Sequence, residues 1–300
     1  MATYKLYQVD AFTKEKFRGN PAGVVLNADG LSEKQMQDIA REMNCSETAF
    51  VLSPQNNTHD VWIRYFTPKT EVPICGHATI ASHYVRAKEK NYESGTVMSK
   101  TKAGILPIDI IKEQNDYKIV MTQGKIDLGS FIEGKNKNTL IQALGLSISD
   151  LNKDCPIQIV STGHSKVIIG IKKRLTLNSL IPDLAELAKL SKTIDCYGYF
   201  VFTFDSEDNN ILTAGRMFAP AIGINEDPVT GNAHGPLGAY LVNNKLVKPE
   251  KDVFRFIGMQ GETIQRTGFV EVAVSIKDNK PIKTQVGGNA VIVFETSISL

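Results

Sequence analysis

The feature that most constrains the fold of this chain is an internal repeat. The segments RYFTP and EVPICGHA, at residues 64–68 and 71–78, recur as RMFAP and EDPVTGNA at residues 216–220 and 226–233. Each copy has the pattern of a strand, a loop with Glu and Pro in register, and a helix that begins at a glycine. Because the copies lie about half the chain length apart, they predict two halves with a similar fold.

Strand and helix patterns alternate through both halves. The clearest helix start follows Ser32, where Gln35 completes a capping box and the apolar residues 36, 39, 40 and 43 share one helix face. Glycine-led helices are expected at residues 76–87 and 231–243, and the polar segment 127–138 is expected to be a linker. Strands are expected at residues 4–12, 22–26, 48–52, 61–66, 105–111, 117–121, 157–160, 167–171, 197–204, 211–218, 253–257, 269–276, 283–286 and 290–295.

Composition argues against several classes of function. The 34 Lys and Arg residues against 32 Asp and Glu leave a net charge of +2, which gives no electrostatic footprint for nucleic acid. No apolar run reaches the roughly 18 residues that span a bilayer, and the N-terminal segment lacks the layout of a signal peptide. The four cysteines form no CxxC pair, which favours a reducing cytoplasm, and the five histidines have no zinc-ligand spacing. We therefore expect a cytoplasmic protein without membrane, nucleic-acid or metal partners.

The repeated helix starts predict an anion site. The first turn of a helix has N–H groups without intrahelical acceptors and carries a partial positive charge. Gly76 and Gly231 let the backbone approach a ligand closely. If an approximate twofold axis relates the two halves, these helix starts face each other across a cleft that would hold a carboxylate.

Several side chains in the repeat are candidates for chemistry. Cys75 corresponds to Thr230, which is no base at neutral pH, so a symmetric two-cysteine racemase is not expected and Cys75 is expected to pack as a small buried residue. His77 corresponds to Asn232, and both can hydrogen-bond a substrate oxygen. Asp227 is a further candidate, with turn formation or helix capping as the alternative.

Glu47 is the candidate acid–base group. It lies in the segment CSETAF at residues 45–50, between a helix pattern and an apolar strand. Apolar surroundings raise the pKa of a carboxyl group by desolvation, which suits a general acid or base near neutral pH. From composition alone, the alternative is a glutamate at a strand edge with no chemical role.

These residues carry a resemblance to a known family. The sequence resembles the PhzF-like (phenazine-biosynthesis-like) proteins over nearly its whole length. The similar motifs are several and occur in order: DAFT at residues 10–13, FRGNPAG at 17–23, SETAF at 46–50, RYFTP at 64–68, CGHAT at 75–79, RMFAP at 216–220, EDPVTG at 226–231 and QG at 260–261.

The resemblance implies a mixed α/β (α+β) fold of the diaminopimelate-epimerase type. It has two pseudo-symmetric domains, each a curved sheet or barrel around a central helix. The expected halves are residues 1–122 plus about 284–300, and residues 123–283, with the active site in the cleft between them. Family members are typically homodimers, and the type enzyme moves a proton without a metal or an organic cofactor.

The resemblance also implies roles for individual residues. Carried over to this sequence, Glu47 is the proton shuttle, while His77, Asp227 and Asn232 bind and orient the substrate. The type enzyme has serine at the position of Asn232, so the resemblance covers the chemistry and not the substrate. The glycine-led segments that hold the substrate's carboxylate contain Gly76, Ala78, Gly231 and Ala233.

The leading hypothesis is a cofactor-independent isomerase that acts on a small carboxylate metabolite. A single carboxylate can move a proton between two carbons on one face of a substrate but cannot readily invert a centre, which favours double-bond isomerisation. The rival enzyme is an amino-acid epimerase or racemase of the same fold. A rival from another class is a non-catalytic small-molecule-binding or scaffold protein.

Overall fold

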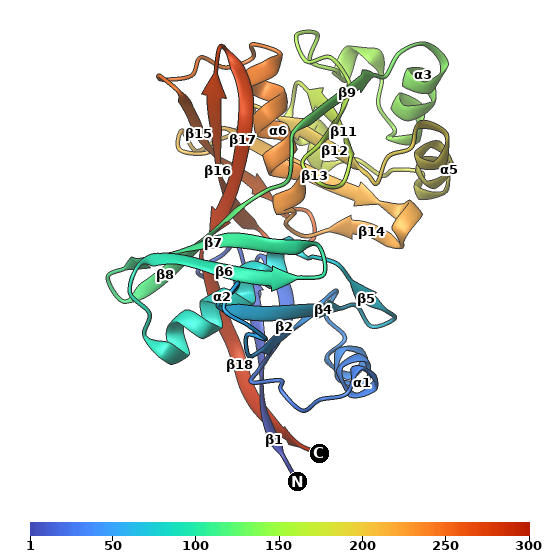
Figure 1. The fold of residues 1–300 in the computed structure, drawn as a ribbon. Coiled ribbons are helices and arrows are strands. Elements are labelled where there is room, and N and C mark those ends of the chain that lie inside the picture. Colours follow the sequence, from blue (N-terminus) through green and yellow to red (C-terminus); the bar gives the residue numbers. More distant parts are fainter. The chain divides into compact units, whose positions relative to one another are not determined.

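A computed structural model describes all of residues 1–300 and divides into two compact units (Figure 1). The first unit contains Met1–Thr122 and Gly287–Leu300, and the second contains Gln123–Val286. The boundary after Thr122 is the one expected from the sequence, and the second boundary lies three residues later than expected, inside a strand. The mixed α/β fold with two similar halves is confirmed.

The first unit is a curved sheet with two helices. Its strands pair in the order β18, β1, β2, β3, β4, β6, β7, β8, and the short β5 pairs with the end of β4. The elements are β1 (Thr3–Ala11), β2 (Asn20–Leu26), α1 (Glu33–Met43), β3 (Thr48–Leu52), β4 (Val61–Phe66), β5 (Glu71–Val72), α2 (Gly76–Lys90), β6 (Gly95–Thr101), β7 (Gly104–Glu113), β8 (Asp116–Thr122) and β18 (Ala290–Ser299).

The second unit repeats this plan. Its strands pair in the order β9, β10, β11, β12, β13, β15, β16, and the short β14 pairs with β13. The elements are β9 (Asp127–Phe131), α3 (Gly134–Ala143), η1 (Ile148–Asp150), β10 (Gln158–Ser161), β11 (Lys166–Ile171), α4 (Arg174–Asn178), α5 (Leu184–Ile194), β12 (Tyr199–Thr203), β13 (Thr213–Ala219), η2 (Pro220–Ile222), β14 (Ile224–Asp227), α6 (Gly231–Asn243), β15 (Val253–Gln260), β16 (Gly268–Lys277) and β17 (Lys280–Gly288).

The repeat extends well beyond the motifs visible in the sequence. From β18 to β7, and from β9 to β16, the neighbouring strands are antiparallel, antiparallel, parallel, antiparallel, parallel and antiparallel in the same sequence. Helices α1 and α5 have the same length of 11 residues, and each ends at a residue in the left-handed conformation, Asn44 and Asp195. The two halves therefore correspond in the order and direction of these strands and in the helix pairs α1 with α5 and α2 with α6, while α3, η1, α4 and η2 are additions of the second unit.

Each unit encloses one helix in its sheet. Helix α2 is buried from His77 to Ala87 and contacts strands of both edges and the centre of the first sheet, including β1, β2, β3, β8 and β18. Helix α6 is buried from Ala233 to Val242 and contacts β10, β11, β15 and β16. Both helices are thus buried around most of their circumference, as expected for helices enclosed by a sheet. This arrangement fixes the position of both glycine-led helix starts.

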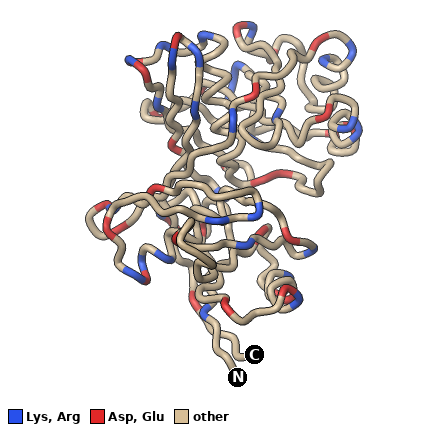
Figure 2. Tube along the Cα trace, viewed as in Figure 1, with Lys and Arg blue, Asp and Glu red and all other residues tan.

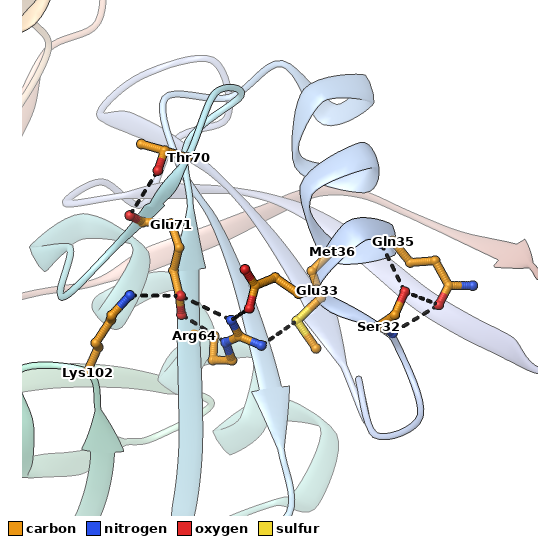
Figure 3. Close-up of polar contacts among 8 residues, drawn as sticks. All are labelled: Ser32, Glu33, Gln35, Met36, Arg64, Thr70, Glu71 and Lys102. Carbon is orange, nitrogen blue, oxygen red and sulfur yellow. Dashed lines mark hydrogen bonds and ion pairs between the residues drawn. The ribbon is translucent and has the colours of Figure 1, made fainter.

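An Arg–Glu pair holds the loop before each enclosed helix. Arg64 on β4 forms two hydrogen bonds to Glu71 on β5, from Nε to Oε1 at 2.8 Å and from Nη2 to Oε2 at 3.0 Å (Figure 3). Arg216 on β13 binds Glu226 on β14 in the same way, at 2.9 and 2.8 Å. The repeated Arg and Glu thus have a structural role, since each bidentate pair positions the chain that leads into α2 or α6.

Most of the predicted elements are confirmed, with shifted ends. The predicted capping box at Ser32 is present, and β3, β4 and α6 have the expected bounds. The linker expected at residues 127–138 is wrong, because this segment forms β9 and the first turns of α3. Its polar composition reflects an edge strand and an exposed helix start, while the apolar residues that anchor α3 in the core come later, at Leu140, Ile141 and Ala143.

Charge is mixed along the chain. Figure 2 shows Lys and Arg lying among Asp and Glu in both units, which agrees with the small net charge. None of the helices is both long and apolar enough to cross a membrane.

Candidate active site

The first unit brings Glu47, Cys75 and His77 together. His77 Nε2 lies 3.3 Å from Glu47 Oε2 and 3.2 Å from Ser46 Oγ. Cys75 Sγ lies 3.4 Å from His77 Nδ1 and 3.9 Å from His77 Nε2. The side chains of His77 and Glu47 are only 9% and 16% exposed. A carboxylate, an imidazole and a thiol therefore meet in a largely buried place at the start of α2.

The backbone around Cys75 is fixed by its own helix. Cys75 is the residue before the first turn of α2, and its carbonyl accepts hydrogen bonds from the N–H and the hydroxyl of Thr79, at 3.0 and 2.6 Å. The buried hydroxyl of Tyr65 lies 2.7 Å from the Thr79 hydroxyl. No side chain caps this helix start. The N–H groups of the first turn, which have no intrahelical acceptor, therefore lie next to the site.

Glu47 is held by the strand beside it. It lies in the short connection between α1 and β3, and its carbonyl accepts a hydrogen bond from the N–H of Gly23 at 3.0 Å. A Cβ on Gly23 would lie 2.5 Å from Thr48 Oγ1, so only glycine lets the two strands come this close. The close pairing of β2 with β3 thereby sets where the Glu47 side chain leaves the sheet.

In the second unit, Asp227 belongs to a tight turn at the start of α6. The Thr230 hydroxyl donates a short hydrogen bond to Asp227 Oδ2. Gln260, which is 1% exposed, donates to the Asp227 carbonyl at 2.7 Å and accepts from the Thr230 N–H at 3.0 Å. The side chains of Asp227, Thr230 and Gln260 thus hold the turn together. This geometry is compatible with both roles expected for Asp227, turn formation and substrate binding. The position of Gln260 explains why the Gln–Gly motif forms part of the sequence pattern.

Asn232 lies in the first turn of α6 and contacts a neighbouring strand end. Its Oδ1 lies 3.2 Å from Thr162 Oγ1, and the Thr162 hydroxyl also contacts Gln123 Oε1 at 2.9 Å. Gln123 in turn donates to the Gly231 carbonyl at 3.0 Å. Asn232 departs from helical dihedral angles, so the chain kinks where the site is expected. Its amide is therefore held in one place and is available to orient a ligand.

The remaining predicted residues lie at the two helix starts. Gly76 and Gly231 are the first residues of α2 and α6. Ala78 and Ala233 are fully buried, so their methyl groups pack in the core and only their backbone can serve a ligand. The structure therefore groups Glu47, Cys75, His77 and Gly76 in the first unit, and Asp227, Asn232 and Gly231 in the second.

Lys166 is a candidate functional residue that the sequence analysis did not identify. It is 5% exposed at the start of β11, and its ammonium donates to the carbonyls of His164 and Ser165 at 3.1 and 3.4 Å. Burial lowers the pKa of Lys166 to about 8, and the charges of Cys196 and Asp227 act in the opposite direction. A lysine at the head of the otherwise apolar strand KVIIGI was the available signal.

His234 predicts a pH dependence of stability in the second unit. It is fully buried, its Nδ1 lies 3.0 Å from the Thr230 carbonyl, and burial lowers its pKa to about 4. The unfolded chain binds this proton with a pKa near 6.5, so stability decreases as the pH falls from about 6.5 to about 4 and then levels off. We expect this one group to reduce the free energy of unfolding by about 3 kcal/mol over that range.

Urea unfolding of the wild type and of His234→Gln at several pH values checks this expectation. The glutamine variant lacks the titrating ring, so its stability should decrease less between pH 6.5 and pH 4 than that of the wild type. Equal decreases in the two proteins would show that His234 does not control the acid sensitivity.

The chain is similar to known proteins in both sequence and structure. The family model described as phenazine biosynthesis-like protein matches residues 9–296. The chain is 59% identical over 297 residues to an uncharacterized isomerase of Clostridium acetobutylicum, which covers 99% of this chain and 98% of that protein. It is 30% identical over 293 residues to the trans-2,3-dihydro-3-hydroxyanthranilate isomerase of Pseudomonas chlororaphis, covering 97% and 98% of the two chains.

Solved structures give the same result for the fold. A phenazine biosynthesis protein of the PhzF family from Bacillus anthracis superposes with a TM-score of 0.90 at 34% identity, covering 100% of both chains. A hydroxyproline epimerase from Agrobacterium vitis superposes with a TM-score of 0.61 at 12% identity, covering 99% of this chain and 93% of that one. At 12% identity this second likeness concerns the fold alone.

Proposed function

Because this chain belongs to the phenazine biosynthesis-like protein family and is an isomerase, we propose that it moves a proton between two carbons of a small carboxylate. In this proposal Glu47 is the single acid–base group. The observation that carries it is the contact of the largely buried Glu47 carboxylate with His77 at 3.3 Å, beside a helix start that no side chain caps.

The structural repeat supports a single base. The N–H of Gly23 bonds to the carbonyl of Glu47 in one unit, and the N–H of Val167 bonds to the carbonyl of Gly198 in the other. The strand pairing gives the same correspondence, because Thr48 and Tyr199 each pair with the Phe of their Arg-x-Phe motif, Phe66 or Phe218. The position equivalent to Glu47 therefore holds a glycine, and the second half has no matching acid.

Gly198 also has no room for an acid. A Cβ at this position would lie 2.4 Å from Met217 Cε and 2.8 Å from the carbonyl oxygen of Phe218, which is backbone. The other repeated position gives the same asymmetry, because Cys75 corresponds to Thr230 and the Thr230 hydroxyl is engaged by Asp227. An epimerase needs a proton donor on each face of the substrate. These two positions favour proton relocation on one face over racemisation.

The chemical steps follow from these groups. The ionised Glu47 removes a proton from a carbon next to a double bond, and the electron pair of that C–H bond moves into the conjugated carboxylate system. Glu47 then returns the proton to the distal carbon, which relocates the double bond without net oxidation. The N–H groups at the start of α2 stabilise negative charge that develops in the intermediate. His77 donates from Nε2 and keeps the Glu47 carboxylate oriented.

Residues of the second unit complete the proposal as substrate-binding groups. The Asn232 amide supplies both a donor and an acceptor, and the first turn of α6 supplies N–H groups for a carboxylate. Asp227 accepts hydrogen bonds, which suits a hydroxyl or amino substituent on the substrate. The specific isomerase activity of the relative from Pseudomonas chlororaphis is that protein's own.

Proton exchange in heavy water tests the function. Small unsaturated carboxylates with hydrogen on the carbon next to the double bond are incubated with the protein in D₂O and analysed by NMR. We expect a substrate whose double bond moves and which gains deuterium at a single carbon, with other stereocentres intact. Deuterium exchange accompanied by inversion at a saturated α-carbon would instead identify an epimerase, and the one-base proposal would be wrong.

A further inference from the structure

The first unit places three different metal-ligand atoms in one small volume. Glu47, Cys75 and His77 each contribute one atom, and these atoms all lie within 4.8 Å of one another. They come from two separate segments of the chain, the connection before β3 and the start of α2. All three residues are largely or fully buried. A carboxylate, a thiol and an imidazole that converge in this way form a donor set of the kind that binds transition metals.

The distances match a zinc ion better than a harder cation. Tetrahedral zinc has bonds of about 2.0–2.1 Å to nitrogen and oxygen and about 2.3 Å to sulfur, which places a nitrogen and an oxygen ligand about 3.3 Å apart and a nitrogen and a sulfur ligand about 3.5 Å apart. His77 Nε2 lies 3.3 Å from Glu47 Oε2 and 3.9 Å from Cys75 Sγ. Small side-chain rotations would bring the thiol into place. Thiolate and imidazole ligands also select zinc over magnesium and calcium.

The site is partly organised before any metal arrives. Hydrogen bonds from Thr79 fix the carbonyl of Cys75, and the bond from Gly23 fixes the carbonyl of Glu47. The metal would replace the contact of Ser46 Oγ with His77 Nε2, now at 3.2 Å. Three protein ligands leave the fourth tetrahedral position open for water or a small ligand. Binding would release the proton of the Cys75 thiol to solvent, since thiolate is the ligand form.

We propose that Glu47, Cys75 and His77 form a zinc-binding site, and that zinc bound there inhibits the enzyme. The binding part of this proposal depends only on the donor atoms and their distances. The inhibition part rests on the proposed function, because a metal on the carboxylate of Glu47 removes the lone pair that accepts the proton. The bound ion is therefore an inhibitor of this site and has no role in the reaction itself.

Cobalt(II) titration tests the binding directly. Co²⁺ takes tetrahedral zinc sites and gives a thiolate-to-cobalt charge-transfer absorption, whereas Zn²⁺ has a filled d shell and gives none. We expect this absorption in the wild type and in the control Cys155→Ala, which removes another buried cysteine, and its loss on adding Zn²⁺. In Cys75→Ala the absorption should be absent. In His77→Gln the affinity for Zn²⁺ should be lower by on the order of 100-fold.

The opposite results are equally clear. No charge-transfer absorption in the wild type, or the same absorption in Cys75→Ala, would overturn the site, and circular dichroism of each variant shows whether it is folded. Inhibition is measured separately, as the ratio of turnover with and without Zn²⁺ in the wild type and in Cys75→Ala. A wild type that binds the metal and keeps full turnover would contradict the role of Glu47 while the binding site stands.

Discussion

Replacing Glu47 with glutamine should reduce turnover by on the order of 1000-fold or more while the substrate still binds. Glutamine keeps the size and the hydrogen-bonding capacity of the side chain but cannot take up a proton. A positioned acid–base group contributes 10²- to 10⁴-fold to such reactions, and here one group would act in both proton transfers. Its loss should therefore appear in kcat, with KM changed little. Steady-state kinetics with the substrate from the D₂O screen provides the measurement.

A matched substitution separates chemistry from folding. Glu42 is an exposed residue of α1, five positions before Glu47, and Glu42→Gln changes the same atoms outside the site. This variant should have wild-type kcat and KM. If Glu47→Gln turned over at a rate close to that of Glu42→Gln, the acid–base role of Glu47 would be refuted. Glu47→Asp should retain part of the activity, since it keeps the carboxylate but moves it by one methylene.

The sequence was sufficient to predict the two-domain plan because the residues that make the repeat recognisable have structural functions. The Arg and the Glu of each copy form a bidentate pair, and the glycine of each copy begins a helix that the sheet encloses. Such residues survive where surrounding residues diverge, so a comparison of the chain with itself detects them. The correspondence of α1 with α5 left no such motif, and only the shared strand pairing and helix length make it visible.

The site was predicted only in part, for a related reason. Glu47 and His77 were chosen from separate motifs, and their contact at 3.3 Å depends on the parallel pairing of β2 with β3, which residue spacing does not encode. The same holds for the convergence of Cys75 with these two residues. Metal-ligand spacing in a sequence shows only ligands that lie close together in the chain. It gives no zinc pattern here because the fold brings Glu47 to Cys75 and His77 from a distant segment.

The equivalent side chains of the two halves have also diverged in chemistry while keeping their geometry. Thr79 in α2 and His234 in α6 both bond to the carbonyl of the residue that precedes their helix, at 2.6 and 3.0 Å. The hydroxyl costs little to bury, whereas the imidazole must remain neutral. The second unit therefore carries a pH-sensitive group at a position where the first does not. Both halves thus keep a hydrogen-bond donor for the carbonyl that precedes the enclosed helix, but a different type of residue supplies it.

The Arg–Glu pairs should differ in their contribution to stability, although their geometry is the same. Arg216→Met should destabilise the second unit by about 3–5 kcal/mol, because it leaves the carboxylate of Glu226 buried and removes donors to the carbonyls of Leu177 and Leu180. Arg64→Met should cost about 1–2 kcal/mol, because Lys102 lies 3.2 Å from Glu71 and continues to neutralise it (Figure 3). Urea unfolding, followed by hydrogen exchange in each unit, measures both effects.

A double substitution shows whether the buried carboxylate is the cause. In Arg216→Met with Glu226→Met, no charge remains to be buried alone, so this protein should be more stable than Arg216→Met by about 1–3 kcal/mol. The same second change beside Arg64, Glu71→Met, should restore much less, since Lys102 already compensates Glu71. Equal losses for Arg64→Met and Arg216→Met, or no recovery in the second-unit double variant, would show that backbone positioning by the arginine, and not the isolated charge, determines the stability of these loops.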